Sequence, residues 1–178
     1  MQAFFLATTI CLMQCREAKH DRTPTANDFL LLMNDSTDQF SYQNLRGEVV
    51  IPPGKYIWCL TDTFRNFAIV MNAKQAFVVI DRQEKEVYEV FKYDNGPDYP
   101  ADGLFRIVQN GKIGYANETT YEIVIPAQFD CAFPFENGKA KVSNKCTSET
   151  IGEYNSWNSD HWTYIDVKGQ ETSAPEAK

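Results

Sequence analysis

The chain has 178 residues, 43% of them hydrophobic and 13% aromatic, so it can bury a sizeable core and is too apolar to be a disordered polymer. Its formal net charge is −7 at pH 7, and no basic cluster is interleaved with aromatic residues. An acidic surface repels phosphate backbones, so we expect one compact domain that does not bind nucleic acid.

An apolar run over residues 3–13 opens the sequence and gives way to charged residues from Arg16 onward. The run is too short to cross a hydrocarbon core, which needs about 20 residues, and its length followed by charge is typical of a signal peptide. The stretch Leu12-Met13-Gln14-Cys15 resembles the lipobox at which bacterial lipoproteins are cleaved and acylated. We predict a signal peptide over residues 1–15 with lipid attached to Cys15, then a linker over 16–27. The alternative is an N-terminal helix of a cytoplasmic protein.

Residues 28–170 have the pattern of a β domain, and residues 171–178 have that of a polar tail. The apolar run 29–33 predicts either a first strand or a helical turn. The dipeptide Asn110-Gly111 predicts a hairpin, since both residues tolerate the positive φ of a type I′ turn. Beyond Gly47, short β-branched or aromatic runs bounded by turn formers predict strands over 68–71, 76–80, 104–108, 113–116, 123–125, 140–142 and 163–165.

One segment of the chain recurs. Glu48-Val49-Val50-Ile51-Pro52-Pro53 returns as Glu122-Ile123-Val124-Ile125-Pro126-Ala127 after 74 positions, or two periods of 37, and a weaker copy begins at Glu86. This spacing predicts an all-β tandem array of about three β-hairpin repeats, packed as a solenoid-like or sandwich-like domain. Pro52 and Pro126 are expected to end their strands, because proline donates no ladder hydrogen bond. We expect a shared core that contains Ile51, Phe105, Tyr115, Ile125, Phe129 and Phe135.

Several motifs in this order resemble the bacterial WG-repeat family. They are Gly111-Lys112-Ile113-Gly114-Tyr115, Ile123-Val124-Ile125-Pro126, Phe129-Asp130, Phe133, Phe135 and Gly138-Lys139-Ala140-Lys141-Val142. The resemblance covers roughly residues 47–169. It implies a protein that is exported and binds other molecules, and it carries no catalytic residue over to this chain.

Three cysteines remain if Cys11 is removed with the signal peptide and Cys15 is acylated. A bridge between Cys131 and Cys146 would close a loop of 15 positions and contribute about 3 kcal/mol. We favour the alternative, in which Cys59 and these two cysteines are separate buried thiols. No Cys-x-x-Cys motif exists and the two histidines are far apart, so we expect no metal site and no cofactor.

Three groups of residues are candidates for a site, each with a structural alternative. The acidic loop 94–103 is a candidate for calcium, against a solvated hairpin loop whose Asp and Gly residues form turns. Asp130 and Glu136 are a candidate acid/base pair for glycoside hydrolysis, against an aspartate that accepts local backbone N–H bonds. The aromatic group Tyr154, Trp157, His161 and Trp162 is a candidate platform for a sugar or peptide, against a hydrophobic cap formed by the inserted segment 143–160.

We therefore predict a non-catalytic cell-envelope module that binds or scaffolds an unknown protein or glycan partner. It would be exported and would meet the membrane only through its lipid anchor. The alternative is a surface hydrolase or carbohydrate-binding protein that uses loop carboxylates and aromatics. A third interpretation is a purely structural spacer.

Overall fold

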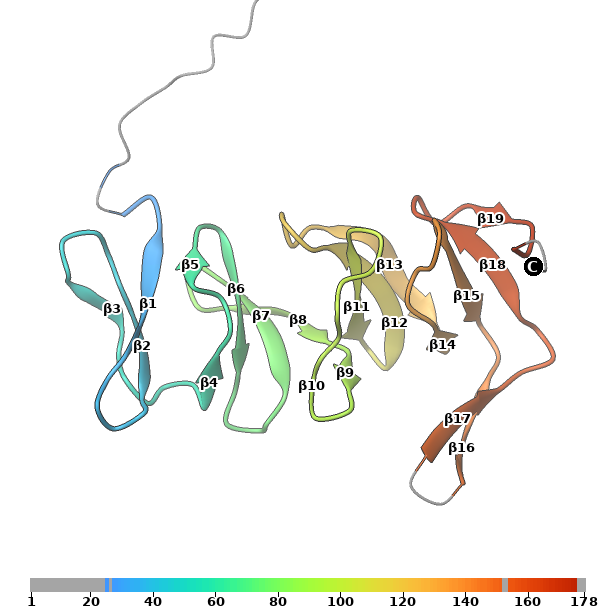
Figure 1. Cartoon of the computed structure of the whole chain (residues 1–178), viewed down its shortest axis with the longest axis horizontal. Helices are drawn as coiled ribbons and strands as arrows, with labels where there is room; N and C mark the ends of the chain where they lie inside the picture. The colour runs from blue at the N-terminus through green and yellow to red at the C-terminus, as the bar shows by residue number, and fades with distance from the viewer. Residues whose placement is uncertain (1–24, 26, 152–153, 176–178) are drawn as a thin grey trace, which may run out of the picture.

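The computed structural model describes residues 25, 27–151 and 154–175, and all the regular secondary structure in these ranges is β (Figure 1). The predicted signal peptide and Cys15 lie outside these ranges, as does most of the predicted linker. Within the described ranges, no helix has the length and hydropathy needed to span a membrane. The prediction of an all-β fold is therefore confirmed.

The strands are short. In chain order they are β1 (Leu30–Asn34), β2 (Phe40–Gln43), β3 (Val49–Ile51), β4 (Trp58–Cys59), β5 (Thr63–Phe64), β6 (Phe67–Met71), β7 (Phe77–Asp81), β8 (Glu86–Val90), β9 (Lys92–Tyr93), β10 (Gly96–Pro97), β11 (Leu104–Gln109), β12 (Lys112–Asn117), β13 (Ile123–Phe129), β14 (Cys131–Ala132), β15 (Lys139–Ser143), β16 (Thr147–Ile151), β17 (Tyr154–Asn158), β18 (Thr163–Asp166) and β19 (Glu171–Thr172). The last of these lies within the segment predicted to be a polar tail.

These strands form a repeating unit of three antiparallel strands. Unit 1 is β1, β2 and β3; unit 2 is β6, β7 and β8; unit 3 is β11, β12 and β13; unit 4 is β15, β18 and β19. The first strands begin at Leu30, Phe67, Leu104 and Lys139, in steps of 37, 37 and 35 residues. The described residues thus hold four units, one more than the predicted three. The Glu-Val-Val-Ile motif and its weaker copy lie in the third strands of units 1, 2 and 3, whereas the third strand of unit 4, β19, does not carry it.

Side chains on the two faces of units 2 and 3 enter different cores, because successive residues of a strand point to opposite faces. The first core joins units 1 and 2, the next joins units 2 and 3, and the last joins units 3 and 4. In β7, for example, Val78 and Ile80 face unit 1 whereas Phe77 and Val79 face unit 3. The units therefore stack along the long axis of the molecule (Figure 1). All six residues predicted to be interior are buried: Ile51, Phe105, Tyr115, Ile125, Phe129 and Phe135.

One kind of turn closes most of the hairpins. Its first residue is Asp or Asn, whose side-chain Oδ1 accepts the N–H groups of residues two positions and three or four positions later. It occurs at Asp35, Asn44, Asn72, Asp81, Asn117 and Asp166. The predicted Asn110-Gly111 turn is confirmed as well: Gln109 pairs with Lys112, and both turn residues have positive φ (53° and 73°).

Pro126 does not end its strand, so that prediction is wrong. β13 continues through Pro126 to Phe129 with a shift of register: Tyr115 pairs with Ile125, whereas Ile113 pairs with Phe129. The extra residues of β13 bulge towards Gly114, and proline is tolerated at a bulge because its missing N–H costs no ladder bond there. The other proline behaves as predicted, since β3 ends at Ile51, immediately before Pro52.

Cys131 and Cys146 form a disulfide, which corrects the preference for separate thiols. β14 pairs with β15 so that Cys131 lies opposite Ser143, and the chain then brings Cys146 back beside it. Cys59 remains a buried free thiol. After Cys146 the inserted segment forms the β16–β17 hairpin, which projects from the side of the array and does not pair with the edge strand β19 (Figure 1).

Candidate functional site

The outer face of unit 4 presents a row of aromatic and cationic side chains, which consists of Phe133, Lys141 and Tyr164. Its inner face buries Ala140, Val142 and Ile165, so the alternate residues of β15 and β18 point outward. Lys141 pairs with Tyr164, and its carbonyl oxygen accepts the N–H of Phe133 at 2.9 Å. The row lines an open groove of about 730 Å³, whose lining residues are Phe133, Pro134, Glu136, Asn137, Lys139, Lys141, Tyr164 and Pro175.

Two of the four predicted aromatic-site residues, Trp157 and Trp162, contact Phe133, which lines this groove. The Phe133 ring contacts Trp157 of the projecting hairpin at 5.3 Å and Trp162 at 5.5 Å between ring centroids, and Trp157 also contacts Phe91 at 5.9 Å. His161 is exposed, and its backbone N–H donates to Ser159 Oγ at 2.9 Å. Tyr154 contributes its backbone to β17, and its side chain lies outside the described part of the structure.

Positive charge accompanies these rings. Lys141 Nζ lies 4.6 Å from the Trp162 ring centroid and 6.0 Å from that of Phe133, within the range of a cation–π contact. Lys139 Nζ donates to the carbonyl oxygen of Ser173 at 2.9 Å. Among the described residues, no carboxylate forms an ion pair with Lys141. Glu136 is the one acidic residue that lines the groove, so the two lysines leave it with a local excess of positive charge.

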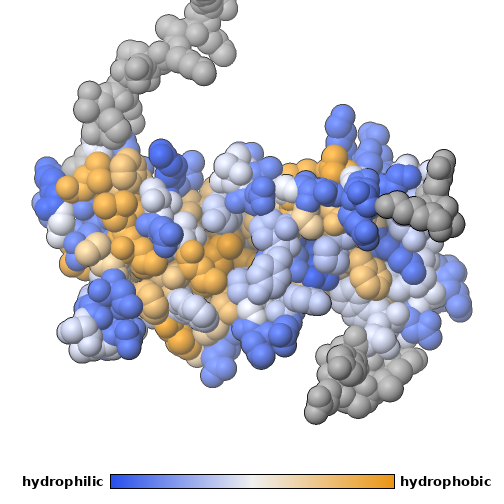
Figure 2. Space-filling model, in the orientation of Figure 1, coloured by the Kyte–Doolittle hydropathy of each residue, from blue (hydrophilic) through white to orange (hydrophobic). Residues whose placement is uncertain are grey.

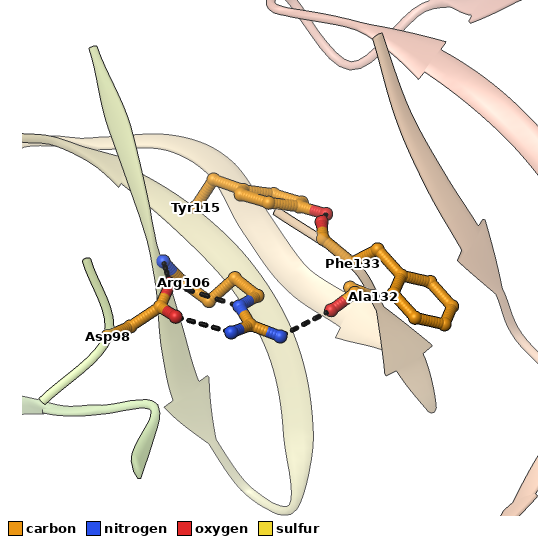
Figure 3. A network of polar contacts seen from close by, with 5 residues as sticks. All are labelled: Asp98, Arg106, Tyr115, Ala132 and Phe133. Atoms are coloured by element: carbon orange, nitrogen blue, oxygen red, sulfur yellow. Dashed lines mark hydrogen bonds and ion pairs between the residues drawn. The ribbon is translucent and has the colours of Figure 1, made fainter. Parts of the chain in front are cut away.

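Unit 3 has a closed counterpart of this row (Figure 3). Arg106 pairs with Tyr115 as Lys141 pairs with Tyr164, and its carbonyl oxygen accepts the N–H of Phe91 at 3.0 Å. The Arg106 guanidinium lies 4.2 Å from the Phe91 ring centroid and is 4% exposed. Two features of the row are thus repeated: a cation opposite a tyrosine, and an aromatic residue bonded to the backbone of the cationic residue.

The counterpart in unit 3 is filled by groups from elsewhere in the chain. Asp98 forms a buried ion pair with Arg106, accepting the Arg106 backbone N–H at 2.8 Å and Nε at 3.0 Å and also contacting Nη2. Arg106 Nη1 donates to the carbonyl oxygen of Ala132 at 3.1 Å, and Tyr115 Oη donates to that of Phe133 at 2.6 Å (Figure 3). Burial raises the pKa of Tyr115 above its usual value, so the hydroxyl stays a donor at neutral pH.

The loop carboxylates have structural partners. Asp98 is buried against Arg106, so loop 94–103 is not simply a solvated hairpin, and Asp102 accepts the N–H of Gly138 at 2.7 Å. Asp130 pairs with Lys112 Nζ at 2.5 Å instead of accepting local backbone N–H bonds. Among the described residues, no group of three or more His, Cys, Asp or Glu side chains is arranged to hold a metal ion.

Comparison with known proteins gives one match. The family model described as "WG containing repeat" matches residues 113–145, which run from β12 to just beyond β15. This stretch includes Gly114, the bulge at Pro126, and Phe133 and Lys141 of the groove. No curated protein and no solved structure matches the chain. The match agrees with the stacked three-strand units of the structure, and residues 113–145 form a repeat of the WG type.

Proposed function

We propose that this chain is a non-catalytic binding module of the cell envelope and that the groove on unit 4 is its contact surface. The observation that carries the proposal is the exposure of Phe133, a residue that is 39% exposed although its ring contacts Trp157 and Trp162. The other phenylalanines in the described ranges are buried or half-buried. An aromatic residue left at the surface beside a cation is typical of an interface.

The use of the carboxylates supports binding over hydrolysis. Asp98 and Asp130 are each held by a cationic side chain, so neither is a free partner for a second carboxyl group. A glycosidase requires two carboxyl groups that flank the scissile bond and exchange protons with it. The alternative of a surface hydrolase therefore loses Asp130, its main candidate residue.

The cysteines support export. A disulfide between Cys131 and Cys146 forms and persists in oxidising compartments, whereas the cytosol keeps thiols reduced. The apolar run 3–13 and Cys15 supply the signal and the acylation site that the proposal requires. Mass spectrometry of the native N-terminus tests this part. We expect the chain to begin at Cys15 with an added acyl mass, and an unprocessed Met1 would contradict export and anchoring.

Site-specific photocrosslinking in native cells tests the contact surface. A photoreactive side chain is placed at Glu136, which is exposed and lines the groove, or at Lys74, which is exposed in the turn between β6 and β7. We expect adducts from position 136 that Phe133→Ala abolishes, and none from position 74. Equal adducts at both positions, or no adducts together with turnover of a glycan or peptide panel, would overturn the proposal.

A further inference from the structure

We propose that the groove on unit 4 binds an extended peptide segment that carries a carboxylate, an inference that rests on the proposed function. Lys141 would pair with the carboxylate, Tyr164 Oη would donate to a backbone carbonyl, and Phe133 would pack against the peptide. The argument for this ligand comes from the molecule itself, because unit 3 holds the same arrangement already filled.

The two arrangements correspond residue by residue. Arg106 and Lys141 occupy the third position of the first strand of their units, and they pair with Tyr115 and Tyr164. Phe91 and Phe133 each donate their N–H to the carbonyl oxygen of the cationic residue, at 3.0 Å and 2.9 Å. The cation also lies near the corresponding ring in both units: Arg106 is 4.2 Å from the Phe91 centroid, and Lys141 Nζ is 6.0 Å from the Phe133 centroid and 4.6 Å from that of Trp162.

The groups that fill the site in unit 3 are those of an extended peptide and a carboxylate. Ala132 and Phe133, at the end of β14, supply two backbone carbonyl oxygens, and Asp98 supplies the carboxylate. Phe135 adds an aromatic ring 4.8 Å from Tyr115. Unit 1 repeats part of this pattern.

In unit 1, Tyr42 occupies the position of Tyr115. Its hydroxyl donates to the carbonyl oxygen of Thr61 at 2.8 Å, just beyond β4, and its ring lies 5.4 Å from Phe64. Two tyrosines of the array are therefore covered in the same way, by a backbone carbonyl and a phenylalanine from the segment that leads into the next unit. An extended chain is the ligand for which this surface is built.

Unit 4 presents the same groups without these partners. Within the described ranges, no carbonyl accepts a hydrogen bond from Tyr164 Oη and no carboxylate pairs with Lys141. Both side chains are only partly buried, and both line the groove. The local positive charge of Lys139 and Lys141, in a chain whose formal net charge is −7, favours an acidic ligand over a basic one.

A sugar is the other ligand that such rings accept, by stacking against a pyranose face. It would use Phe133 and Trp162 but would reproduce neither the carbonyl at the tyrosine nor the carboxylate at the cation. The contacts in units 1 and 3 therefore favour the peptide, and a neutral oligosaccharide serves as the competing probe.

Binding to the full chain is measured by fluorescence anisotropy with a synthetic peptide that copies residues 129–137 and carries Cys131→Ser. In the array, this segment covers Tyr115, and it contains Asp130 and Glu136. The control peptide adds Asp130→Asn and Glu136→Gln. An N-acetylglucosamine oligosaccharide is the neutral sugar probe. We expect the acidic peptide to bind about tenfold more tightly than its amide control, which corresponds to about 1.4 kcal/mol of binding free energy.

Variants of the protein locate the site. We expect Lys141→Met to weaken the acidic peptide about tenfold and to abolish its preference over the amide peptide, as loss of one partly exposed charge pair predicts. Lys74→Met, at an exposed turn of unit 2, should leave binding unchanged. A charge swap distinguishes a lost charge pair from a misfolded variant. The variant Lys141→Glu should bind a peptide with Asp130→Lys and Glu136→Lys better than it binds the acidic peptide.

Each contrary outcome has a distinct meaning. Equal binding of the acidic and amide peptides, or an unchanged preference in Lys141→Met, would overturn the role of the carboxylate. Binding of the oligosaccharide alone, lost in Phe133→Ala, would overturn the peptide ligand and keep the groove as a contact surface. No binding of any probe would overturn this inference, and the proposed function would then depend on whether position 136 still forms adducts in cells.

Discussion

The third position of the first strand changes role from unit to unit. In each unit it pairs with a residue of the second strand, which is tyrosine in units 1, 3 and 4 and valine in unit 2. In unit 3 it is a buried cation neutralised by Asp98, and in unit 4 it is a cation at the surface. The residues at this position are Leu32, Ile69, Arg106 and Lys141.

Removal of one partner of the buried pair should be costly. We expect Asp98→Asn to lower the free energy of unfolding by about 3 kcal/mol, because it leaves the Arg106 charge buried without a counter-ion. The asparagine oxygen can still accept the Arg106 N–H, so adding Arg106→Met should recover part of the loss. Urea denaturation measures both free energies. The control is Asp130→Asn at the partly exposed pair with Lys112, which we expect to cost less than about 1 kcal/mol. A larger loss in the double variant would contradict this account.

Gly114 should tolerate no side chain. A Cβ at this position would lie 2.5 Å from the carbonyl oxygen of Ile125 and 2.6 Å from the N atom of Ala127, both backbone atoms of the bulged strand. We expect Gly114→Ala to lower the free energy of unfolding by at least about 2 kcal/mol, in the upper part of the range for overpacked sites. At Gly96 nothing lies within 4 Å of such a Cβ, so Gly96→Ala should change stability by less than about 0.5 kcal/mol. Thermal melts of the two variants measure both changes. Equal stability of the two variants would count against the bulge.

Cys59 should react slowly in the folded protein. Burial raises the pKa of its thiol to about 11, so little thiolate forms at pH 8. We expect alkylation at pH 8, followed by mass spectrometry of the peptide that contains Cys59, to be much slower in the folded than in the urea-unfolded chain. Because the folded pKa is raised, the stability from this thiol is present below pH 9 and is lost as pH rises towards 11. Equal alkylation rates would show that Cys59 is not buried.

Strand positions follow from local sequence, whereas strand ends depend on the neighbouring strand. The β-branched and aromatic runs predicted seven strands to within two residues at their starts, and Asn110-Gly111 predicted the β11–β12 turn. Pro126 was misread because a proline ends a strand or sits in a bulge depending on its partner. The signal for the bulge is Gly114, the one residue opposite it that has no Cβ to obstruct the approach.

The disulfide joins two elements that local sequence does not connect. It links Cys131 of β14 to Cys146, just before β16, and so holds the projecting hairpin that carries Trp157 beside Phe133. Cysteine spacing alone left free thiols as the favoured interpretation. The β14–β15 pairing, which sets the two cysteines side by side, was needed to decide it.

Reduction of this bond should loosen both the fold and the groove. We expect a loss of about 3 kcal/mol in the free energy of unfolding for the closed loop of 15 positions. We also expect a red shift of tryptophan emission as Trp157 leaves Phe133. Both changes are measured with and without dithiothreitol. Cys146→Ala should show them already and respond no further to the reductant, and an unresponsive native chain would contradict the role of the bond.

At the scale of the molecule, the repeat predicted the array but undercounted it. The Glu-Val-Val-Ile motif buries one residue per copy, Ile51 in unit 1 and Ile125 in unit 3, and leaves the two residues before it exposed. On the face shown in Figure 2, hydrophobic residues are most extensive over the half that holds β1 to β7. Unit 4 was harder to identify, because its third strand β19 does not carry the motif and the inserted hairpin separates its first strand from its second.

Only part of the site could be predicted from the sequence, because the rest depends on how the strands pair. Clustering of aromatics along the chain identified Trp157 and Trp162, which both contact Phe133 beside the groove. Lys141 and Tyr164 come from β15 and β18, and Phe133 directly follows β14. Only the strand register and the Phe133 N–H bond to Lys141 place the three in one row. Their signal is the correspondence with Phe91, Arg106 and Tyr115, which becomes visible once the units are aligned strand by strand.

The central claim is that unit 4 repeats unit 3 with its site left open, and an experimental structure of the chain tests it most directly. After superposition of the two units, we expect Phe133, Lys141 and Tyr164 to coincide with Phe91, Arg106 and Tyr115, with the groove open beside Lys141. A structure in which Lys141 pairs with a carboxylate of its own chain, or in which β15 and β18 pair in another register, would contradict the claim.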